Sequence, residues 1–293
     1  MQKIRGIHFW FLENWKKVVL CVLGILAIWG VSQVLLTINR ALNAGKLTDY
    51  LERADVAYAQ ESYEEAFELY KKAAQTDRKS SAAFIGLGDV AYALGSFGDA
   101  RAYYYKADQK NPQVLVKIAK TKLQSISISF SAVEELCQKA LSIDPNYIEA
   151  HYVLALSAAG QTNLKKATQK LSLSNLSGLS DLLQKASQQE NELYKKTLVA
   201  HALLQEDFPY LAQPLLQQVL DEKSDYRDAR VLLGATYLKM GEYEKALTEL
   251  NVAAEIDPIY AQTFELLGKT YQTLDNEEKA KENLERAENL RGD

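Results

Sequence analysis

From residue 47 onward, the sequence repeats itself every 34 residues. Leu233-Gly234 recurs at Leu267-Gly268, and Tyr237 recurs at Tyr271. The same interval relates three further pairs: Ala246 and Ala280, Leu250 and Leu284, and Ala253 and Ala287. A fixed period of this length is typical of a solenoid, because each repeat is one small unit that can bury its apolar face only against its neighbours. The period therefore predicts a stacked array, although a length of 293 residues alone would suggest two compact domains.

The period divides residues 47–293 into seven repeats and one insertion. Each repeat is expected to form two antiparallel helices, and small residues at its eighth and twentieth places, such as Gly234 and Ala246, should let the two helices approach closely. Ser180 is a candidate cap for a helix from Asp181 to about Gln205, which would absorb the insertion. Repeats one to seven are expected at 47–80, 81–114, 115–147, 148–181, 193–226, 227–260 and 261–293, with the insertion at 182–192.

A recurring pattern within the repeats resembles that of the tetratricopeptide repeat family. It runs aromatic-x2-Leu-Gly, then Ala-x3-aromatic, then Ala and Pro, and in repeat two it consists of Phe84, Leu87-Gly88, Ala100, Tyr104, Ala107 and Pro112. The resemblance implies an all-α fold, a superhelical solenoid of about seven helix-turn-helix units. It also implies that the first helices of the repeats line a concave groove for protein partners.

The resemblance further implies which residues line that groove, at places 2, 5, 9, 12 and 13 of each first helix. The candidate partner-binding residues are Leu51, Tyr58, Ile85, Asp89, Tyr92, Tyr152, Leu156, Tyr194 and His201. An apolar, aromatic groove suits a helix or an extended apolar segment. The family's carboxylate clamp needs Lys, Asn and Arg, whereas this sequence has Asp55 and Asp89, so binding of that kind is not expected. Alternatively, the tyrosines cover neighbouring helices and bind nothing.

Before the repeats, an uncharged run from Val18 to Asn39 predicts one transmembrane helix. It holds 13 Val, Leu and Ile residues up to Ile38, and a bilayer core needs about 20 apolar residues. Residues 1–17 are expected at the cytoplasmic interface and residues 40–46 as a linker. The alternative is a cleaved signal, whose apolar region would be about 7–15 residues followed by small residues. This run is longer, and Leu42-Asn43-Ala44 is a poor cleavage site.

The charges flanking the run favour a cytoplasmic N-terminus, with the repeats outside the cytoplasm. Four basic residues precede the run and three follow it closely: Lys3, Arg5, Lys16 and Lys17, then Arg40, Lys46 and Arg53. Residues 1–46 hold six of the 34 basic residues but only one of the 38 acidic residues, so the repeats are acidic. By its resemblance to membrane-anchored repeat proteins, the chain is expected in a bacterial inner membrane.

Several functions are not expected from this sequence. Two cysteines exclude a disulfide framework and a four-cysteine zinc site, and no phosphate-binding loop or nucleophile elbow is present. An acidic repeat region does not suit nucleic acid. We therefore expect no enzyme activity, metal, cofactor or small-molecule substrate.

The leading hypothesis is a membrane-anchored protein-protein interaction scaffold, of the kind that accompanies secretion, chaperone or envelope-assembly machinery. The alternative is a structural subunit held by lateral packing of its transmembrane helix.

Overall fold

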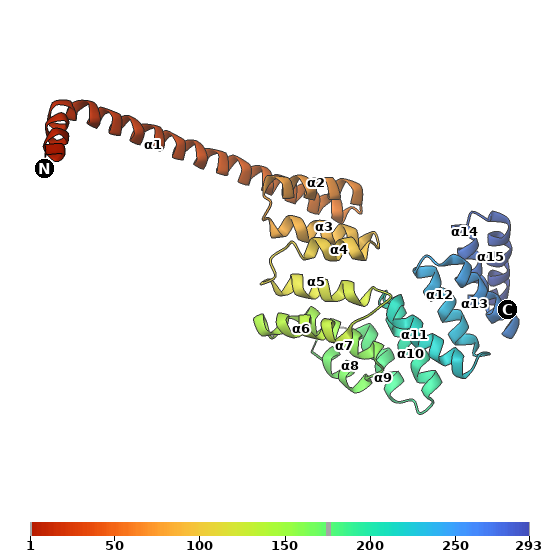
Figure 1. Ribbon diagram of the computed structural model, residues 1–293. Helices are drawn as coiled ribbons and strands as arrows, with labels where there is room; N and C mark the ends of the chain where they lie inside the picture. Colours follow the sequence, from red (N-terminus) through yellow and green to blue (C-terminus); the bar gives the residue numbers. More distant parts are fainter. Residues whose placement is uncertain (1, 174–176, 293) are drawn as a thin grey trace. The chain divides into compact units, whose positions relative to one another are not determined.

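The computed structural model describes residues 2–173 and 177–292. These residues form fifteen α-helices and no strand, which confirms the predicted all-α class (Figure 1). The chain divides into two compact bodies, an N-terminal body of residues 1–90 and a C-terminal body of residues 91–293.

The N-terminal body begins with a single long helix, α1 (Gln2–Ala59), followed by α2 (Tyr63–Thr76) and most of α3 (Ser81–Ala93). Residues 40–46, expected as a linker, are helical, so the apolar run and the first helix of repeat one belong to the same helix. The last part of α1 packs against α2, and the two bury Ala54, Ala57, Ala66 and Leu69. A helical connection of this kind fixes the apolar run and repeat one on one axis.

The apolar part of α1 is long enough to cross a membrane, and none of its described side chains is buried. Ile28, for example, is 73% exposed. The polar residues in this stretch bond to the helix itself, because the Ser32 hydroxyl donates to the Trp29 carbonyl (2.7 Å) and the Thr37 hydroxyl to the Val34 carbonyl (2.7 Å). Hydroxyls satisfied in this way lower the cost of placing these residues in hydrocarbon.

The C-terminal body is a stack of short helices. Consecutive helices form the antiparallel pairs α5–α6, α7–α8, α10–α11, α12–α13 and α14–α15, and the first helices also contact one another along the stack. This is the packing of an α-solenoid (Figure 1). The helices are α4 (Phe97–Tyr104), α5 (Pro112–Leu123), α6 (Phe130–Ile143), α7 (Ile148–Gly160), α8 (Leu164–Leu171), α9 (Ser177–Ser187), α10 (Glu192–Gln205), α11 (Pro209–Glu222), α12 (Arg227–Lys239), α13 (Tyr243–Ile256), α14 (Ala261–Thr273) and α15 (Glu277–Gly292).

Glycines let the paired helices approach, as predicted from the eighth place of the repeat. A Cβ atom on Gly234 would lie 2.5 Å from Leu250 Cγ, and one on Gly268 would lie 2.7 Å from Leu284 Cγ. Both distances are far below van der Waals contact, so only glycine fits without a shift of the neighbouring helix. The repeated Gly and Leu are therefore two sides of the same close contact.

The predicted helix from Asp181 to Gln205 is wrong, because the structure has two helices there. The helix α9 ends at Ser187, and α10 begins at Glu192 after a short turn. Asn191 caps α10, since its side-chain oxygen accepts a hydrogen bond from the Tyr194 backbone N–H (3.0 Å). The helix α9 packs against α8 and α10 and buries Leu179, Leu183 and Ala186. The insertion therefore adds a helix to the stack rather than lengthening α10.

Candidate functional site

In the N-terminal body, the predicted groove residues form an aromatic and acidic cluster on α1 and α3. The Tyr70 hydroxyl donates a hydrogen bond to Asp55 Oδ1 (2.6 Å), and the Tyr58 ring lies edge-on to Tyr63 at 5.7 Å. Burial, with a smaller contribution from Asp89, raises the pKa of Tyr58. The remaining two candidates of this body, Leu51 and Ile85, are half-buried. Tyr58 and Asp55 already contact side chains of α2, so this part of the surface is closer to a covered surface than to an open binding face.

In the C-terminal body, two predicted tyrosines contact the chain itself. The Tyr152 hydroxyl donates to the Glu206 carboxylate, and burial together with this bond raises its pKa. The Tyr92 ring lies 5.1 Å from the Phe97 ring, and the Lys120 ammonium lies 5.2 Å from the centroid of the Tyr92 ring. Burial raises the pKa of Tyr92 to about 12. Both tyrosines therefore make the intramolecular contacts expected under the alternative in which they cover neighbouring elements.

The Tyr152 hydroxyl contacts the turn between α10 and α11, residues 206–208, and Gln124 links Tyr92 to the same turn. Gln124, at the end of α5, donates from Nε2 to the Asp207 backbone carbonyl (2.5 Å), across 83 residues of sequence. The Lys239 ammonium, from α12, lies 2.7 Å from Asp207 Oδ1. The turn thus lies against residues from α5, α7 and α12, and it covers part of the surface that the first helices were expected to expose.

Leu156 is fully buried, at 0% exposure, so its assignment to the groove surface is wrong. It lies on α7, which packs against α5, α6, α8, α10 and α11. Every residue of α7 from Val153 to Ala159 is buried. A helix surrounded on most sides has no exposed groove face at this level. The places that the resemblance assigns to the groove do not take this packing into account.

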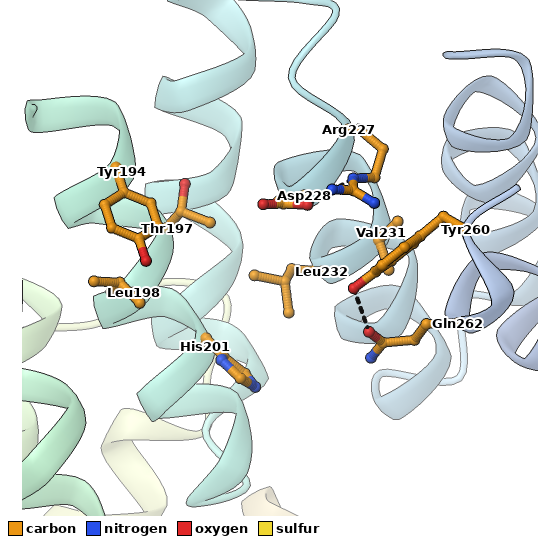
Figure 2. A pocket seen from close by; sticks show the side chains of 10 residues that line it. All are labelled: Tyr194, Thr197, Leu198, His201, Arg227, Asp228, Val231, Leu232, Tyr260 and Gln262. Atoms are coloured by element: carbon orange, nitrogen blue, oxygen red, sulfur yellow. Dashed lines mark hydrogen bonds and ion pairs between the residues drawn. The ribbon is translucent and has the colours of Figure 1, made fainter. Parts of the chain in front are cut away.

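The remaining candidates, Tyr194 and His201, line a pocket on the first helices of three successive repeats (Figure 2). Both side chains extend from α10 and face α12, which contributes Arg227, Asp228 and Val231. Tyr260, just before α14, and Gln262, within α14, close the far side. The pocket has a volume of about 250 Å³.

One wall of this pocket is a fixed network around Arg227. Its guanidinium stacks 3.8 Å from the Tyr260 ring centroid and pairs with Asp228 (2.7 Å) and Asp257 (3.1 Å). The Tyr260 hydroxyl donates to Gln262 Oε1 at 2.8 Å (Figure 2). A cation held by two carboxylates and an aromatic face is pre-organised, so this wall requires little ordering when a ligand binds.

The opposite wall carries a neutral imidazole. Burial lowers the pKa of His201 below its usual value, so the ring is mostly uncharged at pH 7. Gln205 Nε2 lies 3.3 Å from His201 Nε2, which suits an amide donating to an unprotonated ring nitrogen. The pocket therefore offers aromatic faces and hydrogen-bonding groups without an uncompensated positive charge.

Sequence reasoning missed Arg227, Tyr260 and Gln262. The first two lie at or just before the start of a first helix, outside the places that the resemblance assigns to the groove. One signal was present, because Tyr226 and Tyr260 are 34 residues apart at the junctions between repeats. Within the described residues, no group of three or more His, Cys, Asp or Glu side chains is arranged to hold a metal ion.

The fold and the pocket together define a helical-repeat protein with a small pocket on its first helices. Two family profiles described as tetratricopeptide repeat match the sequence, one over residues 57–123 and 203–264 and the other over residues 261–293. Together they cover more than half of the chain. The chain therefore belongs to the tetratricopeptide repeat family.

No curated protein sequence matches the chain. Among solved structures, YrrB, described as a TPR protein with an unusual peptide-binding site, is 20% identical; 76% of this chain and 93% of YrrB align, with a TM-score of 0.34. A tetratricopeptide repeat protein from Parabacteroides merdae is 16% identical, with 84% and 93% aligned and a TM-score of 0.40. The Cut9–Hcn1 complex gives 16% identity, with 82% and 42% aligned and a TM-score of 0.42.

Proposed function

We propose that this protein is a membrane-anchored scaffold that binds a segment of a partner protein in the pocket between α10, α12 and α14. The pocket carries the proposal, because it combines stacked aromatic rings with fixed polar groups on the face formed by first helices. At about 250 Å³ it is smaller than the roughly 300–1,000 Å³ of small-molecule sites. A cavity of this size suits one or two side chains of a peptide.

The chemistry of the pocket favours an uncharged polar or aromatic side chain as its occupant. Arg227 is already paired with Asp228 and Asp257, and His201 is neutral near pH 7. An anionic occupant would therefore lose hydration without gaining a free counter-ion, because one guanidinium paired with two carboxylates leaves this network with a net negative charge. Tyr194 and Tyr260 provide aromatic surface for packing, and tyrosine is enriched among the residues that dominate binding energy at interfaces.

The membrane anchor in this proposal is the apolar part of α1. Its exposed apolar side chains and self-bonded hydroxyls suit hydrocarbon, and the flanking basic residues favour a cytoplasmic N-terminus with the repeats outside the cytoplasm, in a bacterial inner membrane. The proposal assigns no catalytic step to the protein.

Affinity purification of the full chain from its membrane, with quantitative mass spectrometry, tests the binding role. The pocket variant carries Tyr194→Glu and His201→Glu, and the matched control carries Gln217→Glu and Gln218→Glu on the exposed side of α11. We expect recovery of the partner to fall at least tenfold for the pocket variant only, with helicity unchanged in both. Equal recovery from the two variants would refute the pocket as the binding site.

A structural role for the membrane helix is the second candidate, favoured by the open surroundings of Gly24 and Gly30 on α1. Small residues let helices pack closely in lipid. Replacing residues 18–39 with an unrelated apolar helix separates the two roles. Retained partner recovery supports the anchor, whereas loss of a membrane complex with an intact pocket supports lateral packing.

A further inference from the structure

The apolar part of α1 contains a glutamine whose side chain has no hydrogen-bond partner. Gln33 is exposed, and its side-chain amide makes no hydrogen bond with any residue that the structure describes. The two nearby hydroxyls differ, because Ser32 donates to the Trp29 carbonyl and Thr37 to the Val34 carbonyl. The helix therefore satisfies its own hydroxyls in this stretch and leaves the amide of Gln33 unsatisfied.

An unsatisfied amide is costly in hydrocarbon. Gln33 lies about 7 Å along the helix axis from the middle of the run between Val18 and Asn39, whereas half of a bilayer core is about 15 Å thick. A carboxamide has two N–H donors and an acceptor oxygen, and lipid chains offer no partner for any of them. Such a side chain is stabilised in lipid when a neighbouring helix supplies the missing hydrogen bonds.

The residues around Gln33 form a face of α1 that suits a second helix. Five residues are spaced alternately three and four apart, the spacing at which two supercoiled helices keep facing each other. They are Leu23, Leu26, Gly30, Gln33 and Thr37. Gly30 has nothing within 4 Å of an added Cβ atom, so a second backbone has room to approach. The face ends at Arg40, where the like charges of two copies would repel.

A second copy of this chain is the occupant that fits this face. Copies that insert in the same orientation place their Gln33 side chains at the same depth. Each amide is both a donor and an acceptor, so two of them at one depth satisfy each other through reciprocal hydrogen bonds. A different helix would need a polar side chain of its own at that depth, whereas a symmetric pair provides it by necessity.

We propose that α1 pairs in parallel with α1 of a second copy in the membrane, with the two Gln33 amides hydrogen-bonded to each other across the contact. The pairing rests on the proposed membrane anchor and does not involve the pocket around Arg227. Each pair of chains carries two such pockets, so a partner with two binding segments gains avidity.

Cysteine crosslinking of the full chain in isolated cell membranes tests the pairing. In a Cys21→Ser background, Leu26→Cys places a thiol on the proposed contact, and the matched control Ile28→Cys places one at nearly the same depth on the opposite side of the helix. The remaining native thiol, that of Cys137, is buried. During oxidation with copper phenanthroline, disulfide-linked dimer should form roughly fivefold faster from Leu26→Cys, because only that thiol faces its counterpart. Similar rates at the two positions would overturn the proposal.

Substitution of Gln33 tests the hydrogen bond itself. In the Leu26→Cys chain, Gln33→Leu should slow dimer formation about three- to tenfold, the worth of an interhelical hydrogen bond in lipid. Gln33→Asn keeps the amide and should restore most of the rate. Ser32→Leu is the matched control and should leave the rate unchanged, since that hydroxyl is satisfied within its own helix. An unchanged rate in Gln33→Leu would overturn the proposal.

Two further outcomes separate the pairing from the membrane anchor on which it rests. Release of the chain from membranes by alkaline carbonate would contradict the anchor, and the pairing with it. A crosslinked adduct of another mass in place of the dimer would show that a different helix covers this face, which overturns the pairing and leaves the anchor intact. Tyr194→Glu with His201→Glu tests the pocket by partner recovery, so the binding role fails separately.

Discussion

Within the described residues, six adopt a positive φ, each in the turn between two paired helices. Two are glycines, Gly95 and Gly241, and the other four are Glu61, Thr162, Asp207 and Asp275. The turns of these hairpins place a left-handed residue there, which for a residue with a Cβ costs about 1–2 kcal/mol. The strain is greatest for a β-branched side chain. Thr162 (φ 55°) is therefore the most strained turn residue among them.

Replacing Thr162 with glycine should stabilise the hairpin of α7 and α8. The relief of strain is partly offset by the greater freedom of glycine in the unfolded chain, so we expect a gain of about 0.5–1 kcal/mol. Hydrogen exchange of the α7 and α8 amides measures it. Gln161→Gly is the matched control, because φ there is −93° and glycine relieves nothing. Slower exchange must appear in Thr162→Gly alone, and its absence would show that the turn is unstrained.

The close contact at Gly234 predicts that replacing this glycine destabilises the protein. An alanine there would place its Cβ 2.5 Å from Leu250 Cγ, and overpacking of this kind costs about 1–3 kcal/mol. Combining Gly234→Ala with Leu250→Ala should cost less than the sum of the two, because the smaller side chain makes room. Gly45→Ala on α1, which has nothing within 4 Å of its added Cβ, should instead stabilise its helix by about 1 kcal/mol. Thermal unfolding followed by circular dichroism gives all four values, and additive losses would contradict the contact.

His201 makes the stability of the C-terminal body depend on pH. Burial lowers its folded-state pKa below the unfolded value of about 6.5, so protonation favours the unfolded chain. Its contribution is fully present above pH 6.5 and is lost as pH falls through the folded pKa. NMR titration of the ring should give a midpoint below 6.5. The melting temperature should fall more between pH 7.5 and 5.5 in the unaltered chain than in His201→Asn, and equal falls would count against the buried neutral ring.

At the scale of elements, the continuity of α1 is the feature with the clearest consequence. The helix runs from the apolar stretch through Lys46 to Ala59 without a break. Residues 40–59 therefore extend roughly 30 Å at 1.5 Å per residue, which makes a stiff rather than a flexible connection.

A proline in this connection should break it. Gly45→Pro removes a backbone donor and clashes with the preceding turn, which costs about 3 kcal/mol or more. We expect trypsin to cleave at Arg40 or Lys46 at least tenfold faster in this variant, in nanodiscs, than in the unaltered chain. Gly45→Ala should remain as resistant as the unaltered chain. Rapid cleavage of all three proteins would indicate a flexible linker.

The helix pairs could be predicted from the sequence because each contact that defines them, such as Gly234 with Leu250, falls at a fixed place in the 34-residue period. The break between α9 and α10 could not, because it depends on Asn191 capping α10 within a segment that has no counterpart in other repeats. The burial of Leu156 and the bond from Gln124 to Asp207 depend on how distant repeats pack. A periodic pattern carries no information on contacts across 83 residues.

Only part of the candidate site could be predicted from the sequence, because some of its contacts also depend on how repeats pack. Tyr194 and His201 fall at places that the resemblance assigns to the groove, whereas the wall opposite them depends on Arg227 at the start of α12 stacking on Tyr260 just before α14. Tyr92 and Tyr152 also fall at places that the resemblance assigns to the groove, yet their partners Phe97 and Glu206 lie within the chain. The sequence alone does not distinguish a tyrosine that awaits a partner from one that already has one.

At the scale of the whole molecule, the orientation in the membrane can be tested with a single cysteine. Ser224 is exposed in the turn between α11 and α12, whereas the native Cys137 is buried and Cys21 lies in the apolar part of α1. In Ser224→Cys, with Cys21→Ser, a membrane-impermeant maleimide should label cells whose outer envelope is permeable but whose inner membrane is intact. Labelling only after lysis would place the repeats in the cytoplasm.

The most direct test of the proposed function is a photocrosslinking map of the C-terminal body in living cells. A photoreactive amino acid is placed at Gln262, on the rim of the pocket, and at Gln218 and Thr248, which are exposed on second helices. The proposed function predicts one discrete adduct from Gln262 that disappears when Tyr194 and His201 are replaced by glutamate, and none from the other two positions. Adducts of similar yield from all three positions, or an adduct at Gln262 that survives those replacements, would contradict it.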